Sequence, residues 1–350
     1  MKAITLVKYG PSAQAFKIRE LPDPELGAGS LKIKVDYSGL NFADVMARLG
    51  LYQDAPKLPA VLGYDVVGRV VQLGSDVSKV EDPELADFKV GQRVVAFTRF
   101  GGYADTVVVN SLAATPIPED WDGATATALA TQYCTAHYAA CEMVRLFPGD
   151  RVLIQAAAGG VGTALVQMAK NAGCEVFGTA GSASKVAYMK RQGVDHAINY
   201  REQDFAKECS EILKGQKLDV VFDAIGGQTV RKAYDLLGAG GRMVCFGASA
   251  MAGKKANVFR SVKTAASFGL YHPIGFLMSS RAVIGVNMLR IADQKPEVIQ
   301  RCLQSVVKQV AEGKLKPELG KVFAATQIAD AHDYLGLRES IGKVALKWNV

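Results

Sequence analysis

The sequence has few of the residues that build disulfide frameworks. Its six cysteines, in a chain of 350 residues, include no Cys-x-x-Cys pair, and residues 1–7 have the pattern of a strand rather than of a secretory leader. A secreted fold held together by disulfides is therefore not expected. We expect free thiols and a reducing, cytoplasmic setting.

Long runs of one charge and low-complexity segments are also absent. Hydrophobic residues make up 49% of the chain and charged residues 21%, a globular balance that argues against disorder. The net charge of +7 is spread over both halves, and the nearest basic cluster, residues 253–263, is thin. We therefore expect a solvated surface and no nucleic-acid partner.

One uncharged stretch, residues 152–169, is long enough to suggest a membrane span. It contains two glutamines and three glycines, and it divides into a strand pattern followed by a helix pattern. Buried parallel strands also have continuous apolar sequences. We interpret the stretch as a strand and a helix of a water-soluble domain.

The length predicts two domains, because single cores stop growing at about 250–300 residues. Residues 1–125 contain short strand patterns separated by glycines, such as the alternating residues 31–37 and the apolar runs 66–73 and 93–97. This pattern predicts an irregular β domain.

Strand and helix patterns alternate from residue 126 onward. Strands are expected at residues 151–155, 175–179, 196–198, 219–224, 241–246 and 281–288, with helices between them. The rhythm is typical of a doubly wound parallel sheet. We assign residues 126–290 to a Rossmann dinucleotide-binding domain. Residues 1–125 and 291–350 form the other domain, which an amphipathic helix at 297–312 and a closing strand at 343–348 would complete.

The most informative motif is residues 156–162, which read Ala-Ala-Ala-Gly-Gly-Val-Gly between a predicted strand and a predicted helix. In this A-x-x-G-x-x-G variant, Gly159 would let the backbone approach a pyrophosphate, and Gly162 would let the helix pack against the strand. The N–H groups at the start of the helix would bind the pyrophosphate. The neighbouring βα units favour this interpretation over a purely structural turn.

The end of the second predicted strand distinguishes NADPH from NADH. Enzymes that use NAD usually carry an acidic residue there for the ribose hydroxyls, whereas residues 178–185 contain none. Ser182 can hydrogen-bond a 2′-phosphate and Lys185 can neutralise it. The sequence therefore predicts NADPH.

Further motifs extend over nearly the whole chain, at residues 39–44, 48–52, 198–201 and 246–247. Together with the glycine loop and the segment after it, they resemble the medium-chain dehydrogenase/reductase superfamily, in its zinc-free quinone oxidoreductase branch. Residues 41–48 and 342–344 are most similar to the vesicle amine transport protein-like oxidoreductases of that branch.

The resemblance implies an α/β protein with a GroES-like irregular β-barrel catalytic domain and a Rossmann domain, usually as a homodimer. Tyr200 is expected near the adenosine. The resemblance implies cofactor contacts at Asn41, Thr135, Gly159, Gly160, Val161, Gly162, Gly181, Ser182, Lys185, Tyr200, Phe246 and Gly247.

The same resemblance bears on metal binding. Zinc-dependent relatives carry a cysteine at the position of Asn41, a His-Glu pair at Tyr64 and Asp65, and a third ligand near Thr131. None of these residues is a thiolate or imidazole. The four-cysteine structural lobe is also missing, since residues 75–133 contain no cysteine. We therefore expect no metal.

Without a metal to stabilise an alkoxide, hydride delivery from NADPH to a quinone or an α,β-unsaturated carbonyl is the favoured chemistry. Asn41 and Tyr52 are the candidate catalytic residues, as hydrogen-bond donors near the reacting centre. Tyr52 as a packing residue is an equal alternative, and Tyr64 is open to the same two interpretations. The spacing of Asp44 and Arg48 predicts a helical ion pair.

Three questions stay open. An enoyl-thioester reductase would share the hydride chemistry, and a non-enzymatic NADPH-binding scaffold that contacts membrane or RNA is the alternative of another class. The apolar segment 250–280 favours a pocket wall or a dimer contact over membrane attachment. The acceptor itself is not predicted, because such pockets are lined by apolar side chains of many kinds.

Overall fold

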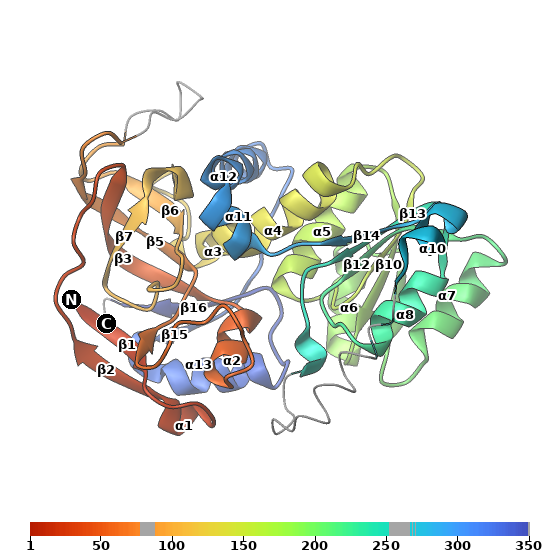
Figure 1. The fold of residues 1–350 in the computed structure, drawn as a ribbon, viewed down its shortest axis with the longest axis horizontal. Helices are drawn as coiled ribbons and strands as arrows, with labels where there is room; N and C mark the ends of the chain where they lie inside the picture. The colour runs from red at the N-terminus through yellow and green to blue at the C-terminus, as the bar shows by residue number, and fades with distance from the viewer. Residues whose placement is uncertain (78–87, 252–266, 268, 270, 349–350) are drawn as a thin grey trace. The chain divides into compact units, whose positions relative to one another are not determined.

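A six-stranded parallel sheet forms the core of one half of the protein (Figure 1). The computed structural model describes residues 1–77, 88–251, 267, 269 and 271–348. The chain divides into a first unit, Met1–Cys134 with Met288–Val350, and a second unit, Thr135–Asn287. Within the described residues, no helix has the length and apolar character needed to cross a bilayer.

The sheet of the second unit has the strand order β11-β10-β9-β12-β13-β14, and all its neighbouring strands are parallel. Numbered along the chain, the strands have the order 3-2-1-4-5-6 of a doubly wound dinucleotide-binding sheet. Successive strands are added on one side of β9 as far as β11 and then on its other side, starting with β12. The strands are β9 (Arg151–Ile154), β10 (Glu175–Ala180), β11 (His196–Asn199), β12 (Leu218–Asp223), β13 (Leu237–Cys245) and β14 (Ala282–Gly285).

Helices cover both faces of this sheet (Figure 1). They bury the central strands completely, since Val152, Phe177 and Val221 are 0% exposed, which explains the continuous apolar runs of the sequence. The predicted Rossmann fold is confirmed, and residues 152–169 form a strand and a helix. The helices are α4 (Cys134–His137), which begins on the last residue of the first unit, α5 (Gly160–Asn171), α6 (Ala183–Arg191), α7 (Phe205–Leu213), α8 (Gln228–Asp235) and α10 (Pro273–Ser279).

The sixth predicted strand is shorter than expected. The apolar pattern suggested residues 281–288, but β14 ends at Gly285 and Met288 already begins helix α11 (Met288–Gln294). The basic cluster at 253–263 and much of the apolar segment 250–280 lie outside the described residues.

The first unit is built on β-strands, as its sequence predicted. Its neighbouring strands pair antiparallel except for β15 and β16, which are parallel. Its larger sheet has the order β15-β16-β3-β5-β6-β8, with β7 also paired to β3, and its smaller sheet has the order β2-β1-β4. The strands are β1 (Lys2–Leu6), β2 (Phe16–Glu20), β3 (Ser30–Leu40), β4 (Ala60–Val61), β5 (Asp65–Leu73), β6 (Arg93–Phe97), β7 (Thr106–Asn110), β8 (Ala114–Pro116), β15 (Leu319–Ala324) and β16 (Lys343–Lys347).

The strand predicted at 343–348 returns to the N-terminal sheet, where β16 pairs antiparallel with β3. The amphipathic helix predicted at 297–312 is also present, shifted by one residue at each end, and buries Ile299, Leu303 and Val306. The helices of this unit are α1 (Ser12–Ala15), α2 (Phe42–Arg48), α3 (Gly123–Ala128), α11, α12 (Pro296–Ala311) and α13 (Ile328–Gly336).

Candidate functional site

The glycine motif forms the turn between β9 and α5. Ala156, at the position of the first glycine of the motif, has a φ of 54°, a left-handed conformation that glycine adopts without strain. Gly162 cannot carry a side chain, because a Cβ there would lie 2.3 Å from the Ala156 carbonyl oxygen and 2.7 Å from the Ala157 Cα. The start of α5 therefore packs directly on the turn, as predicted for Gly162.

Helix α5 begins at Gly160, so the N–H groups of Gly160, Val161 and Gly162 lie in its first turn, where an α-helix provides no internal acceptor. A Cβ on Gly159 would meet the Ala156 carbonyl oxygen at 3.2 Å. These backbone donors and the close-packed turn fit a pyrophosphate.

Two buried polar groups support the carboxyl ends of the strands beside the turn. The Thr179 hydroxyl donates to Gln155 Oε1 at 2.6 Å and links the ends of β10 and β9. Asp223, fully buried at the end of β12, accepts hydrogen bonds from the N–H groups of Ile225 and Gly226. Sequence reasoning missed Asp223, although an acid that directly follows an apolar strand is a visible signal.

The residues predicted to bind the 2′-phosphate lie at the end of β10 and the start of α6. Ser182 is the N-cap of α6, and its side chain accepts a hydrogen bond from the Lys185 N–H at 3.4 Å. Tyr200 follows β11 and packs over Gly181, where a Cβ would lie 2.5 Å from the tyrosine hydroxyl. The structure therefore brings these four residues together, without an acidic residue between 178 and 185.

The other predicted cofactor residues of the second unit lie apart from this group. Thr135 is a buried residue of α4. Phe246 follows β13, and its N–H donates to the Asp223 carbonyl oxygen at 3.0 Å. Gly247 packs on Ala224, where a Cβ would meet the carbonyl oxygen at 2.7 Å.

In the first unit, the end of β3 and the starts of β5 and β16 meet at Gly39. The register pairs Gly39 with Asp65 on one side and with Ala345 on the other. A Cβ on Gly39 would lie 2.4 Å from Lys343 Cε and 2.8 Å from Asp65 Oδ2. This glycine leaves the space in which the two charged side chains meet.

Asn41, Asp65 and Lys343 form a buried network in that space, in which Asp65 Oδ2 accepts the hydrogen bonds and Asp65 Oδ1 has no partner among the described residues. Lys343 and Asp65 are both 0% exposed and form an ion pair. The Asn41 side-chain amide donates to Asp65 Oδ2 at 2.6 Å, and its carbonyl oxygen accepts from Lys343 Nζ at 3.2 Å. Asn41 is the N-cap of α2 but turns its side chain to this pair, so both ends of the amide already have a protein partner.

Asp44 holds the two loops that carry Asn41 and Tyr64. Its carboxylate accepts from the backbone N–H of Asn41 at 2.9 Å and of Gly63 at 3.0 Å. The helical ion pair with Arg48 that the spacing suggested is wrong, because Arg48 donates instead to the Gly10 carbonyl oxygen. Complete burial raises the pKa of Asp44 to about 7, and the nearby Asp65 adds to the shift.

Tyr52 lies just past α2, half-buried against the hydrophobic cluster that contains Leu62 and Tyr103. Burial, followed by the charges of Asp54 and Asp44, raises the pKa of Tyr52 to about 12. Its hydroxyl therefore stays protonated at neutral pH and is able to donate a hydrogen bond.

Comparison with known proteins identifies the family. Residues 160–304 match the family described as zinc-binding dehydrogenase, and residues 27–119 match the alcohol dehydrogenase GroES-like domain. The chain is 34% identical over 348 residues to the synaptic vesicle membrane protein VAT-1 homolog of Danio rerio, a match that covers 99% of this chain and 69% of that protein. The chain belongs to the medium-chain dehydrogenase/reductase superfamily.

Solved structures of this superfamily superpose over the whole chain. Escherichia coli quinone oxidoreductase complexed with NADPH has a TM-score of 0.83 and 26% identity, with 99% of this chain and 100% of that chain covered. The CurK enoyl reductase also has a TM-score of 0.83 and 26% identity, with 99% of this chain and 98% of that chain covered. These likenesses confirm the predicted GroES-like and Rossmann fold and fit the zinc-free quinone oxidoreductase branch.

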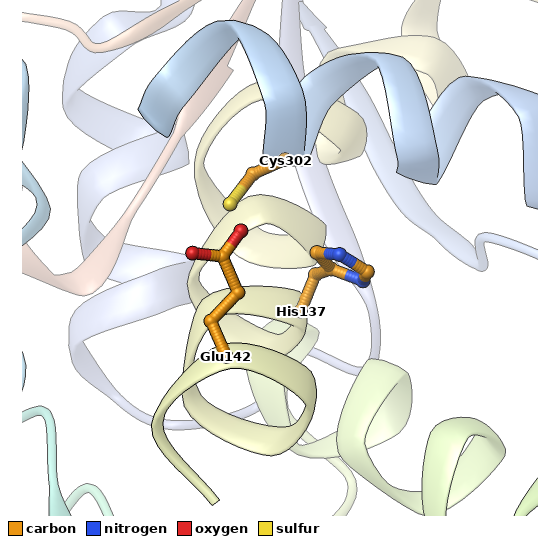
Figure 2. A group of neighbouring side chains, drawn as sticks. All are labelled: His137, Glu142 and Cys302. Atoms are coloured by element: carbon orange, nitrogen blue, oxygen red, sulfur yellow. The ribbon is translucent and has the colours of Figure 1, made fainter. Parts of the chain in front are cut away.

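The description of the matched family refers to zinc, and some side chains of this protein could in principle bind a metal ion. His137 and Glu142 follow each other along one helical stretch of the second unit, with ligand atoms within 4.8 Å of each other (Figure 2). Cys302, also drawn there, comes from α12 of the first unit. Two ligands do not make a structural zinc site, and we assign no metal to this group.

The buried ion pair of this superfamily member has a measurable consequence. Lys343→Met should lower the free energy of unfolding by about 3–5 kcal/mol, because it leaves the buried Asp65 charge without its partner. Lys347→Met, at the exposed end of the same strand, is the matched control and should change it by less than about 0.5 kcal/mol. Chemical denaturation measures the free energy of unfolding of both variants. If both substitutions lowered it by the same small amount, the ion pair would not stabilise the fold as proposed.

Asp44 should make stability depend on pH. The carboxyl has an ordinary pKa of 3.8 and a folded value of about 7, so between these values the folded state keeps a proton that the unfolded chain releases. The stability contributed by Asp44 is therefore complete below pH 3.8 and is lost as the pH rises through about 7.

Denaturation midpoints at about pH 5 and about pH 8 test this dependence, since the wild type should lose more stability over that range than Asp44→Asn. Burial lowers the pKa of His332 to about 3, which costs stability as the pH falls below 6.5. That contribution is common to both proteins and cancels in the difference. Parallel pH profiles for the two proteins would show that Asp44 does not titrate in this range.

Proposed function

We propose that the chain is an NADPH-dependent reductase that delivers a hydride to a quinone or an α,β-unsaturated carbonyl. The observation that carries the proposal is the acid-free end of β10, where Tyr200 packs over Gly181 and the Ser182 hydroxyl accepts the Lys185 N–H. A carboxylate there would repel a 2′-phosphate, whereas a hydroxyl and an ammonium group attract it. The NADPH bound to the related E. coli quinone oxidoreductase supports the same cofactor.

Two segments of the second unit, the start of α5 and the end of β10, would bind different groups of the cofactor. The backbone N–H groups at the start of α5 would bind the pyrophosphate. Ser182 and Lys185 would bind the 2′-phosphate, and Tyr200 would lie beside the adenosine. Bound NADPH supplies the hydride, and the protein orients it and excludes water.

The first unit favours an acceptor that spreads negative charge onto a conjugated oxygen. Its residues at the positions of the catalytic zinc ligands offer no thiolate or imidazole, and Asp65 is already paired with Lys343. A protonated Tyr52 is a suitable hydrogen-bond donor to a developing oxyanion. Asn41 would use its second amide hydrogen toward the nicotinamide ribose or the substrate oxygen.

Turnover against a panel of acceptors tests the proposal. NADPH oxidation should be faster than NADH oxidation with quinones or enones as acceptors. Fastest turnover with enoyl thioesters would favour the chemistry named for the CurK relative. Tight NADPH binding without any turnover would favour a non-enzymatic scaffold, as the name of the vesicle membrane relative allows.

Lys185→Met tests the cofactor assignment directly. Losing one charge-assisted contact should weaken NADPH binding by about tenfold or more and leave NADH binding unchanged. Lys190→Met, an exposed residue of the same helix α6, is the matched control and should affect neither. Cofactor fluorescence titration measures all three proteins, and an equal loss of NADH binding would refute the 2′-phosphate role.

We also propose that the protein is a homodimer. Among the strands of the described residues, β14 is the edge strand of its sheet and pairs only with β13. Helix α10, which packs beside β13, exposes Ile274, Leu277 and Met278 at 63%, 79% and 81%. An open strand edge next to an apolar surface favours self-association. Sedimentation equilibrium should give twice the chain mass, and the monomer mass would overturn this proposal.

A further inference from the structure

The hydroxyl of Tyr64 is buried without a hydrogen-bond partner. The side chain immediately precedes β5 and is 2% exposed. Among the described residues, no group forms a hydrogen bond with its oxygen. A buried hydroxyl in this state loses its hydration without compensation, which folded proteins usually avoid. Other buried hydroxyls, such as those of Thr5 and Thr115, also lack a partner, so a functional role for Tyr64 depends on its surroundings.

Tyr103, a second buried tyrosine of the same unit, shows that the surrounding core does offer partners. Tyr103 is 0% exposed, and its hydroxyl has a hydrogen-bond partner in His332 Nε2, at 3.4 Å. Of these two buried tyrosines of the first unit, Tyr64 is therefore the one whose hydroxyl lacks a partner. Removing the two hydroxyls should have different effects on stability.

The position of Tyr64 is fixed from both sides. Its carbonyl oxygen accepts the Thr98 N–H at 2.7 Å, and the preceding Gly63 N–H is bound by Asp44. The following residue, Asp65, is held in the ion pair with Lys343. The ring packs against Phe100 with the centroids 5.0 Å apart. The backbone and the ring of Tyr64 are therefore held in one place, and a donor that is fixed in advance suits the stabilisation of a developing charge.

The electrostatic surroundings connect Tyr64 with Tyr52. Burial raises the pKa of Tyr64 well above its ordinary value, and the charge of Asp44 and the neighbouring Tyr52 raise it further, while Arg99 opposes the shift. The phenol is thus protonated at neutral pH. It lies close enough to Tyr52 for that phenol to contribute to the raised pKa of Tyr64.

We infer that Tyr64 is a second hydrogen-bond donor to the carbonyl oxygen of the acceptor, beside Tyr52. The inference rests on the proposed reductase function and adds a catalytic residue to it. The acceptor takes up the hydride at its β carbon, and the electron pair of its double bond moves through conjugation onto the oxygen. Tyr64 stabilises that charge and keeps its own proton. A proton from water completes the reduction.

This role narrows the class of acceptor. A site that donates a hydrogen bond from a buried group discriminates strongly against compounds without the matching acceptor atom. The compound must therefore carry an oxygen conjugated with the bond that is reduced. Electron-poor alkenes that have a nitrile in place of the carbonyl should be poor substrates.

Tyr64→Phe tests the inference, because it removes the hydroxyl and leaves the ring. We expect kcat/KM for the best acceptor to fall by about 10- to 1000-fold, as when an oxyanion donor is lost. NADPH affinity, followed by fluorescence, should not change. The thermal midpoint should stay the same or rise, because the hydroxyl has no protein partner to lose. Tyr103→Phe is the matched control, and its midpoint should fall.

The other outcomes are distinguishable. Unchanged kcat/KM in Tyr64→Phe overturns the catalytic role of Tyr64 and leaves the reductase function standing. A lower thermal midpoint shows that the hydroxyl has a structural partner and also overturns that role. A wild-type protein that reduces no member of the acceptor panel refutes the reductase function and the Tyr64 role with it.

Discussion

The ion pair between Lys343 and Asp65 lies where three strands of the first unit meet, with neither side chain exposed to water. Two buried charges are tolerated only when they are paired and hydrogen-bonded, because each loses its hydration. The pair therefore fixes the start of β16 against the start of β5. Asn41 binds both charges, and Gly39 leaves the space that they need.

The proposed chemistry of the first unit depends on this pair. In this chain, an ammonium group from another strand neutralises the buried carboxylate of Asp65. An ammonium group that is bound to a carboxylate and an amide does not act as a Lewis acid. In the proposed mechanism, the phenols of Tyr52 and Tyr64 donate hydrogen bonds to the substrate oxygen, and burial raises the pKa of both phenols.

The fold could be predicted from the sequence because its signals are local. Apolar runs and glycine turns marked the Rossmann strands, and the acid-free segment after β10 indicated the same group that the structure assembles around Gly181. The network of Asn41 could not be predicted, since it joins residues about 300 positions apart through strand register. The spacing of Asp44 and Arg48 misled for the same reason, because tertiary partners outcompeted the helical pair.

The position of β16 near the end of the sequence also affects how the protein folds during synthesis. The second unit comes from one continuous segment, so its sheet is able to form as soon as that segment has left the ribosome. The larger sheet of the first unit has to wait, because β3 pairs with a strand made about 300 residues later. Until then, Asp65 has no cation, and the edge of β3 that β16 will cover is open to chaperones or to other nascent chains.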